Sequence, residues 1–362
     1  MSDNDKLSEI RDKIDSLDEQ IQRLINERAA CAQEVARIKL ETDPQDTTFY
    51  RPEREAMVLR AVKSRNTGPL GDEEMARLFR EIMSACLALE KPLNIAFLGP
   101  EGTFTQAAAL KHFGHSVTTT PFGSIADVFR EVEAGSFDYG VVPVENSTEG
   151  VVSHTLDLFI NSPLAISGEV ILRIHHNLLG RQSDWHNVKT VYSHQQSLAQ
   201  CRRWLDQNLL HAERIAVGSN AEAARLAATD ETSVAIASTE AAALHQLTVH
   251  QSNIEDEPGN TTRFLVIGKQ QPGVSGDDKT SLLLSTKNEA GGLHRLLAPL
   301  AEHGISMTRI ESRPSRRGVW DYVFFVDIVG HKDDPRVATA LKNLESEAGM
   351  CKILGSYPSA VL

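Results

Sequence analysis

Residues 260–268 read Asn-Thr-Thr-Arg-Phe-Leu-Val-Ile-Gly, and this stretch joins a polar entrance to a buried strand. Its second half, residues 264–267, is a short apolar run closed by glycine, which is typical of a strand inside a sheet. Its first half places two hydroxyls and a guanidinium where that strand begins. A fixed guanidinium can bind a carboxylate, so the stretch predicts a binding site at the mouth of a sheet.

On both sides of this strand, from residue 93 to residue 269, the sequence alternates between expected strands and helices. Strands are expected at residues 94–98, 138–144, 188–193 and 233–237, and helices between them include residues 126–133 and 221–228. This alternation predicts an α/β region with largely parallel sheets. Ligands of such regions bind at the carboxyl ends of the strands.

Polar side chains gather where several of these strands end. The glycine-rich turn at residues 99–105 opens a helix and exposes backbone N–H groups to an anion, although a simple tight turn has the same sequence pattern. Each polar group alone is more often a helix cap or a turn than a catalytic site. Together they predict one polar crevice with the members Thr103, Glu145, Asn146, Ser147, Ser193, Gln200, Thr262 and Arg263.

The C-terminal segment, residues 280–362, follows a polar stretch at residues 269–279 that is predicted to be a linker. Its expected order is strand, helix, two strands, helix and strand, a ferredoxin-like α+β arrangement. It contains no cluster of nucleophile, acid and base, so we interpret it as a binding module. A purely structural dimerisation domain is the alternative.

The N-terminal segment, residues 1–91, is predicted to be all-helical, with further helices beginning near Pro52 and at Asp72. Its first helix carries an apolar seam with spacings of three and four: Leu7, Ile10, Ile14, Leu17, Ile21, Leu24, Cys31, Val35 and Ile38. A seam of this length requires a partner along the helix, which predicts a homodimer or a higher homo-oligomer.

Arg28 occupies the same seam, and a buried guanidinium is costly unless an anion meets it. Lys39 lies about 16 Å further along the same face, so the two side chains can close on one small anion. Arg11 lies about 25 Å from Arg28 and can join that site only from an antiparallel second chain. A coiled-coil register device is the alternative interpretation of Arg28. The following loop favours a dianion because it adds Arg51, Arg54 and Glu55.

Arg11, Arg28, Lys39 and the R-x-x-R-E pattern at residues 51–55 resemble the all-helical chorismate mutase domain. The resemblance implies an intertwined dimer that holds one conformer of chorismate and stabilises charge on the breaking ether bond. It assigns carboxylate binding to Arg28 and to Arg11 of the partner subunit, and the ether oxygen to Lys39 and Glu90. Further implied substrate contacts are Arg51, Arg54, Glu55 and Cys86. Some family members have aspartate, serine and glutamine at the positions of Arg51, Cys86 and Glu90. If the helical segment only dimerises the chain, these roles do not apply.

The segments GPEGTF, VPVENS, YSHQQSLAQC and NTTRF together resemble prephenate dehydratase across residues 93–269. The resemblance implies that Thr262 helps the ring hydroxyl of prephenate to leave and that Arg263 anchors a carboxylate. A non-catalytic two-lobed binding protein is the rival class.

The C-terminal segment resembles an ACT regulatory domain that responds to L-phenylalanine. The resemblance rests on the two motifs ESRP and GGLH, and the implied effector-binding residues are Gly291, Gly292, Leu293, Glu311, Ser312, Arg313 and Pro314. The family usually has GALV in the second motif. The whole chain is thus expected to be a multidomain enzyme that converts chorismate to phenylpyruvate for phenylalanine biosynthesis, under feedback by L-phenylalanine.

Composition and charge limit the other partners. The net charge of -12 argues against a nucleic acid or an anionic membrane. The polar N-terminus and the lack of a long apolar run predict a cytoplasmic protein. The four cysteines are widely scattered, so reduced thiols and no bound metal are expected. The resemblance implies no cofactor.

Overall fold

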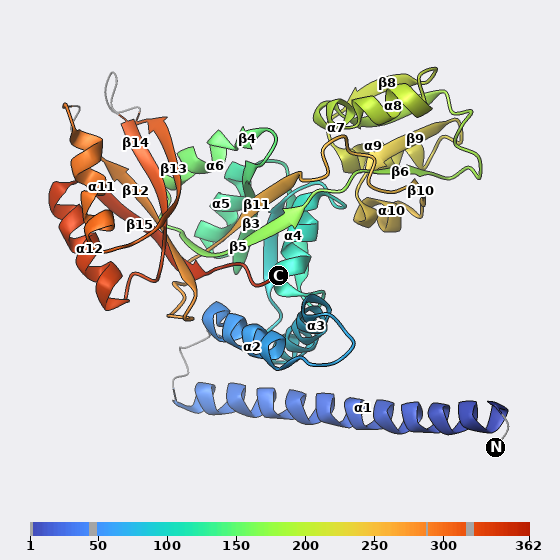
Figure 1. Ribbon diagram of the computed structural model, residues 1–362, viewed down its shortest axis with the longest axis horizontal. Helices are drawn as coiled ribbons and strands as arrows, with labels where there is room; N and C mark the ends of the chain where they lie inside the picture. Colours follow the sequence, from blue (N-terminus) through green and yellow to red (C-terminus); the bar gives the residue numbers. More distant parts are fainter. Residues whose placement is uncertain (1–2, 43–48, 287–288, 316–321) are drawn as a thin grey trace.

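The computed structural model describes residues 3–42, 49–286, 289–315 and 322–362. A helical region, a two-lobed α/β region and a C-terminal α+β region follow one another along the chain (Figure 1). This order confirms the expected fold class.

The helical region consists of α1 (Asp3–Thr42), α2 (Pro52–Arg65) and α3 (Asp72–Glu90). Pro52 occupies the first turn of α2, and α2 packs on α3 through a small core of Leu59, Ala76 and Met83. By contrast, α1 extends along the edge of the molecule (Figure 1). Its apolar seam is open in the single chain, since Ile10 and Leu24 are each 57% exposed.

The first lobe of the α/β region is built on a mixed sheet with the strand order β2-β1-β3-β11-β5, and β4 pairs with β3. Its strands are β1 (Asn94–Leu98), β2 (Thr118–Phe122), β3 (Tyr139–Asn146), β4 (Gly150–Val151), β5 (Ala165–Arg173) and β11 (Thr261–Gly268), and its helices are α4 (Phe104–Phe113), α5 (Ile125–Ala134) and α6 (Ser153–Phe159). Strands β1, β2 and β3 are parallel, but β11 is antiparallel to both β3 and β5, so the expected largely parallel sheet is corrected to a mixed one. The start of β11 therefore lies beside the carboxyl end of β3.

The second lobe has a five-stranded sheet in the order β10-β6-β9-β7-β8, also mixed. Its strands are β6 (Asn177–Gly180), β7 (Thr190–His194), β8 (Glu213–Val217), β9 (Ser233–Ala237) and β10 (Thr248–Gln251), and its helices are α7 (Gln195–Gln200), α8 (Arg202–Asn208), α9 (Asn220–Ala227) and α10 (Thr239–His245). The chain enters this lobe after β5 and leaves it before β11 (Figure 1). Two crossings between lobes place a hinge region next to the start of β11.

The C-terminal region has the expected βαββαβ order, with the antiparallel sheet order β13-β14-β12-β15. Its elements are β12 (Asp278–Ser285), α11 (Gly292–Glu302), β13 (Met307–Pro314), β14 (Tyr322–Val329), α12 (Pro335–Glu347) and β15 (Met350–Pro358). Strand β12 includes the last two residues of the predicted linker.

One face of this sheet is covered by α11 and α12, and the other face packs on the first lobe. Leu283, Phe325 and Tyr357 of the sheet share one apolar core with Val142 and Leu265 of the first lobe. Strand β15 comes so close to β5 that a side chain at Gly355 would overlap the backbone of Ile166. The C-terminal region and the first lobe are thus packed as one body.

Candidate active sites

A cleft of about 310 Å³ lies between the two lobes of the α/β region. The turn before α4, the end of β3, the start of β11 and the first turns of α7 and α9 all contribute to its lining. The cleft brings together four of the expected crevice residues: Thr103, Asn146, Gln200 and Thr262.

A chain of hydrogen bonds connects the cleft residues of the two lobes. The Asn146 amide donates to Thr262 Oγ1 and to Asn260 Oδ1, each at 2.8 Å. The Asn260 amide in turn donates to Gln200 Oε1 of α7, at 3.1 Å. Because the Thr262 oxygen accepts from Asn146, the hydroxyl proton of Thr262 is available to a group bound in the cleft.

His176 and Asn260 belong to this network but were not among the expected site residues. His176 is fully buried, lines the cleft and donates through Nε2 to Gln200 Oε1 at 2.8 Å. Burial lowers the pKa of His176, so its ring is neutral near pH 7, and within the described residues Nδ1 has no hydrogen-bond partner. The two adjacent histidines after strand β5, at positions 175 and 176, are the sequence signal that could have indicated this position.

The structure does not bring Arg263 and Glu145 into the cleft. The Arg263 guanidinium bonds Glu169 at 2.9 Å, Asp327 at 2.5 Å and Tyr357 at 2.9 Å, all on the opposite face of the sheet. Glu145 pairs with Arg309 of β13 at 2.8 Å. Successive side chains of a strand point to opposite faces, so the neighbours of Thr262 and Asn146 face away from the cleft. The expected role of Arg263 as a carboxylate anchor in the cleft is therefore corrected.

Ser147 and Ser193 also lie outside the cleft lining, where they hold backbone segments in place. Ser147 Oγ accepts from the Thr261 N–H at 2.9 Å. The fully buried Ser193 hydroxyl is 2.9 Å from both Asn220 Oδ1 and the Ile236 carbonyl. Both serines act as parts of the scaffold around the cleft, which corrects their expected place in the crevice.

The lining of the cleft, as far as the described residues show, contains no lysine or arginine. The Thr103 hydroxyl, just before α4, donates to the Pro100 carbonyl at 2.9 Å. The amino-terminal residues of α4 and α9, including Thr105 and Asn220, face the same space. Helix amino ends attract anions through exposed N–H groups and the helix dipole, so the cleft can hold an anion without a cationic side chain.

In the helical region, Arg28 and Lys39 of α1 lie near Glu90 of α3. Burial raises the pKa of Glu90, and the positive charges of Lys39 and Arg28 oppose that rise. Lys39 Nζ also lies 5.7 Å from the centre of the Phe49 ring. Cys86 is buried one turn before Glu90 on α3, whereas Arg11 is exposed near the other end of α1. One chain thus assembles part of the expected mutase site.

The three residues of the R-x-x-R-E pattern are divided between different surroundings. Arg51 precedes α2 and lies 3.8 Å from Glu53, and Arg54 is exposed. Glu55 shares a helix face with the buried Leu59, so its carboxylate turns inward.

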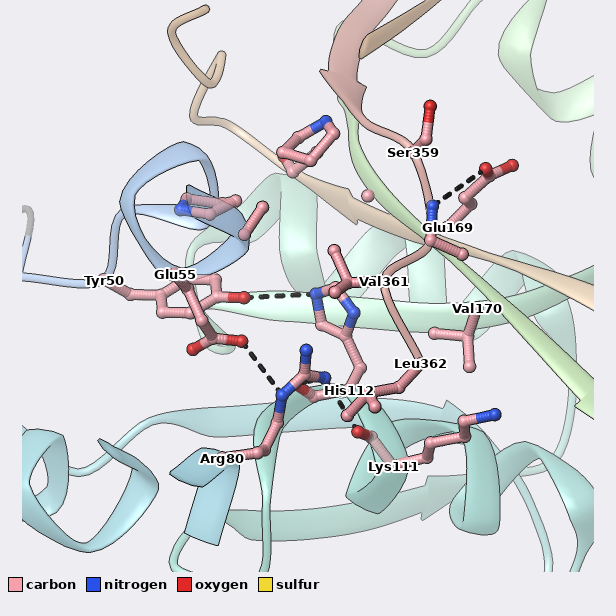
Figure 2. A pocket seen from close by; sticks show the side chains of 16 residues that line it. Tyr50, Glu55, Arg80, Lys111, His112, Glu169, Val170, Ser359, Val361 and Leu362 are labelled. Carbon is pink, nitrogen blue, oxygen red and sulfur yellow. Dashed lines mark hydrogen bonds and ion pairs between the residues drawn. The ribbon is translucent and has the colours of Figure 1, made fainter. Parts of the chain in front are cut away.

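Figure 2 shows Glu55 directed toward Arg80, with the two groups 3.2 Å apart. They line a cavity of about 30 Å³ with Tyr50, His112 and the segment 358–362. Burial raises the pKa of Glu55, and the nearby Arg80 opposes that rise. Glu55 therefore lies at the junction between the helical region and the first lobe, and its expected contact with the mutase substrate stays a prediction.

The expected effector residues lie at two places in the C-terminal region. Gly291, with φ +76°, precedes α11, and Gly292 and Leu293 form its first turn. The segment Glu311–Pro314 lies on β13, the edge strand of the sheet, so a second subunit can approach it. Arg313 is directed toward the first lobe, 2.8 Å from Ser153 Oγ and 3.2 Å from Asp157.

Within the described ranges, no three or more histidine, cysteine, aspartate or glutamate side chains gather as metal ligands would. In the same residues, no helix combines the length and apolar character needed to cross a membrane.

Comparisons with known proteins cover the whole chain. Models of three families match it: chorismate mutase type II at residues 10–91, prephenate dehydratase at residues 95–272, and the ACT domain at residues 280–346. A bifunctional chorismate mutase/prephenate dehydratase from Pseudomonas aeruginosa is 56% identical, over 100% of both chains.

Two solved structures resemble the dehydratase and ACT part. Prephenate dehydratase from Arthrobacter aurescens in complex with L-Phe is 33% identical with a TM-score of 0.68, covering 74% of this chain and 90% of that chain. A protein described as GqqA, a novel type of quorum quenching acylase, is 30% identical with a TM-score of 0.68, covering 74% of this chain and 98% of that chain.

The fold and the two candidate sites define a multidomain enzyme with a helical mutase domain, a two-lobed dehydratase domain and an ACT domain. The chain belongs to the family of bifunctional chorismate mutase/prephenate dehydratases. It is accordingly both an isomerase and a lyase of aromatic amino acid biosynthesis.

Proposed function

We propose that residues 1–91 rearrange chorismate to prephenate, that residues 93–269 convert prephenate to phenylpyruvate, and that residues 280–362 regulate the enzyme. The observation that carries the dehydratase assignment is the hydrogen bond from Asn146 to Thr262 inside the cleft, at 2.8 Å.

The dehydratase reaction removes the ring hydroxyl and one carboxylate of prephenate together, and the product ring becomes aromatic. Aromatisation supplies the driving force, so the enzyme mainly assists the departing hydroxide. The Thr262 hydroxyl donates to that oxygen while Asn146 holds the Thr262 oxygen in place. The neutral His176 lies in the same network and offers Nδ1 as an acceptor to the substrate.

Neutral donors hold the two carboxylates of prephenate in this proposal. Arg263 lies on the opposite face of the sheet, so the amino ends of α4 and α9 supply the positive electrostatic potential in the cleft. Backbone N–H groups aimed at a fixed point are effective anion ligands in a site that excludes water.

The mutase reaction needs orientation and charge stabilisation without a nucleophile. Arg28 and Lys39 bind the dianion, and Lys39 with protonated Glu90 serves the ether oxygen. Arg51, Arg54 and Cys86 are proposed to contact the substrate in this same mutase site.

A homodimer completes the mutase site. The open seam of α1, from Leu7 to Ile38, is the apolar surface that a second α1 would cover. An antiparallel partner brings Arg11 of the partner subunit toward Arg28 and Lys39.

L-Phenylalanine is the proposed effector, since the relative from Arthrobacter aurescens was solved with L-Phe and the ACT match covers the expected binding segments. The first turn of α11 and residues 311–314 of β13 would contribute to its site.

The test follows the consumption of chorismate and of prephenate in separate assays, each with and without L-Phe. The proposal predicts turnover of both substrates and inhibition of prephenate turnover by L-Phe. Binding of prephenate without phenylpyruvate formation would instead support a non-catalytic binding protein.

A further inference from the structure

Strands β3 and β11 carry different chemistry on their two faces. Thr262 is opposite Asn146 in the register, and this pair faces the cleft. The next pair, Arg263 opposite Glu145, faces the C-terminal domain instead. On each strand, the residue next to the candidate catalytic pair therefore makes a contact with the C-terminal domain.

Arg263 is held by a closed polar cluster that spans both domains. Besides Asp327 and Tyr357 it bonds Glu169 of β5, and Glu169 also accepts from Lys279 at 2.6 Å. The Ser281 hydroxyl is 2.6 Å from Asp327 and 2.7 Å from the Tyr357 hydroxyl. Glu169 and Tyr357 are fully buried, and Asp327 is nearly so. Buried and mutually bonded charges of this kind fix the position of the strands that carry them.

Glu145 connects β3 to the strand that carries the expected effector residues. Its partner Arg309 lies on β13, two residues before Glu311, and only 12% of its side chain is exposed. On the same strand, Arg313 bonds Ser153 and Asp157 of α6. A shift of β13 would thus move Glu145, the residue adjacent to Asn146, through a direct ion pair.

We propose that the Glu145–Arg309 ion pair positions Asn146 against Thr262, and that it transmits the state of the ACT domain to the dehydratase cleft within one chain. The inference rests on the proposed catalytic role of Thr262. Glu145 and Arg309 are positioning residues: they act on the reaction from the reverse face of β3 and contact no substrate.

The Glu145–Arg309 ion pair can be substituted with less risk to folding than the Arg263 cluster. Removing Arg263 would take the guanidinium away from two buried carboxylates, Glu169 and Asp327, and such a variant risks failing to fold. Glu145 is 39% exposed, so Glu145→Gln and Arg309→Gln leave smaller defects. The matched control is Arg130→Gln, which breaks an exposed ion pair with Asp127 in the same domain.

The experiment measures kcat and KM for prephenate, inhibition by L-Phe, and L-Phe binding by calorimetry, with mutase activity as a check on folding. Each pair variant should lower kcat by about five-fold or more with a nearly unchanged KM. L-Phe should still bind, but its maximal inhibition should decrease. The double variant should be no worse than either single variant, because both remove the same contact.

Thr262→Ala is measured alongside as a test of the catalytic proposal. If Thr262→Ala is inactive, that proposal stands, and either of two results would then contradict the coupling alone. The first is wild-type kcat and full inhibition in either pair variant. The second is loss of L-Phe binding together with inhibition in Arg309→Gln, which would make Arg309 part of the effector site. If Thr262→Ala itself keeps full turnover, the catalytic role and the coupling both fail. If the wild-type enzyme does not respond to L-Phe, the transmission from the ACT domain fails. The comparison of kcat values then tests whether the ion pair positions Asn146.

Discussion

The two candidate active sites differ in how much of each site one chain supplies. In the dehydratase cleft, Asn146, Thr262 and Gln200 come from distant segments of one chain and already form one hydrogen-bond network. In the helical domain, Arg28, Lys39 and Glu90 gather, but Arg11 lies far along an exposed helix. A compact two-lobed fold closes a site by itself, whereas a single long helix offers side chains to a site that a second subunit must complete.

The largest expected effect comes from removing one hydroxyl, that of Thr262, which should affect the dehydratase reaction and not the mutase reaction. Thr262→Ala should lower prephenate turnover by about 10²–10⁴-fold, since it removes the donor to the leaving group, and should leave mutase activity near wild type. Thr261→Ala removes a neighbouring hydroxyl that bonds the Gly259 carbonyl and should keep most dehydratase activity. Parallel assays of both reactions check this. Nearly unchanged prephenate turnover in Thr262→Ala would refute the proposed role.

A smaller effect, confined to the mutase, depends on the protonation of Glu90. A carboxylate beside the ether oxygen would repel the developing charge, so Glu90 must be protonated to donate a hydrogen bond. Burial raises the pKa of Glu90 against the opposing charges of Lys39 and Arg28. Mutase activity should therefore decline as pH rises through the pKa of Glu90 in the substrate complex. Glu90→Gln keeps a neutral donor at every pH and should flatten this decline.

The measurement is kcat against pH for the wild-type enzyme and Glu90→Gln in the mutase assay, with the dehydratase profile of the same samples as the control. The dehydratase profile should not change. Superimposable mutase profiles would mean that Glu90 does not face the ether oxygen.

The remaining expected effect is on stability and concerns the junction between the helical region and the first lobe of the α/β region. Burial lowers the pKa of His112 to about 3, and its Nε2 is 3.1 Å from the Tyr50 hydroxyl. Between about pH 6.5 and 3 the unfolded chain binds a proton at His112 that the folded chain does not bind. Stability is thus complete above this range and is lost as pH falls, by at most about 1.4 kcal/mol per pH unit from this group.

Urea unfolding of the wild-type enzyme and His112→Gln between pH 7 and pH 4 tests this account. The variant should lose stability less steeply on acidification. Substitution of the exposed His211 by Gln should leave the slope unchanged. An equal slope in wild type and His112→Gln would mean that His112 is not held neutral at the junction.

Much of the fold follows from local patterns in the sequence. The heptad seam predicted α1, and the order of strands and helices predicted the α/β and βαββαβ regions, because period and turn residues are local properties. The antiparallel direction of β11 was not predicted, since it depends on how the chain returns from the second lobe. The spacing of residues in the sequence does not predict the direction in which the chain returns.

The candidate sites were predicted less completely than the fold. The segments that hold Asn146 and Thr262 were identified, but the faces of their neighbours Glu145 and Arg263 were not, because a packed ACT domain determines which face is covered. The inward direction of Glu55 was not predicted either, since it depends on what α2 packs against.

The most direct test of the central claim measures both activities in mixed dimers. Dimers of Arg11→Ala and Arg28→Ala chains, isolated with two different affinity tags, should regain about half of the wild-type mutase activity, because one of two symmetric sites is intact. Dimers of Asn146→Ala and Thr262→Ala chains should regain no dehydratase activity, since both residues belong to one chain's cleft. Mutase activity that stays absent in the first mixture, or dehydratase activity that returns in the second, would contradict the account.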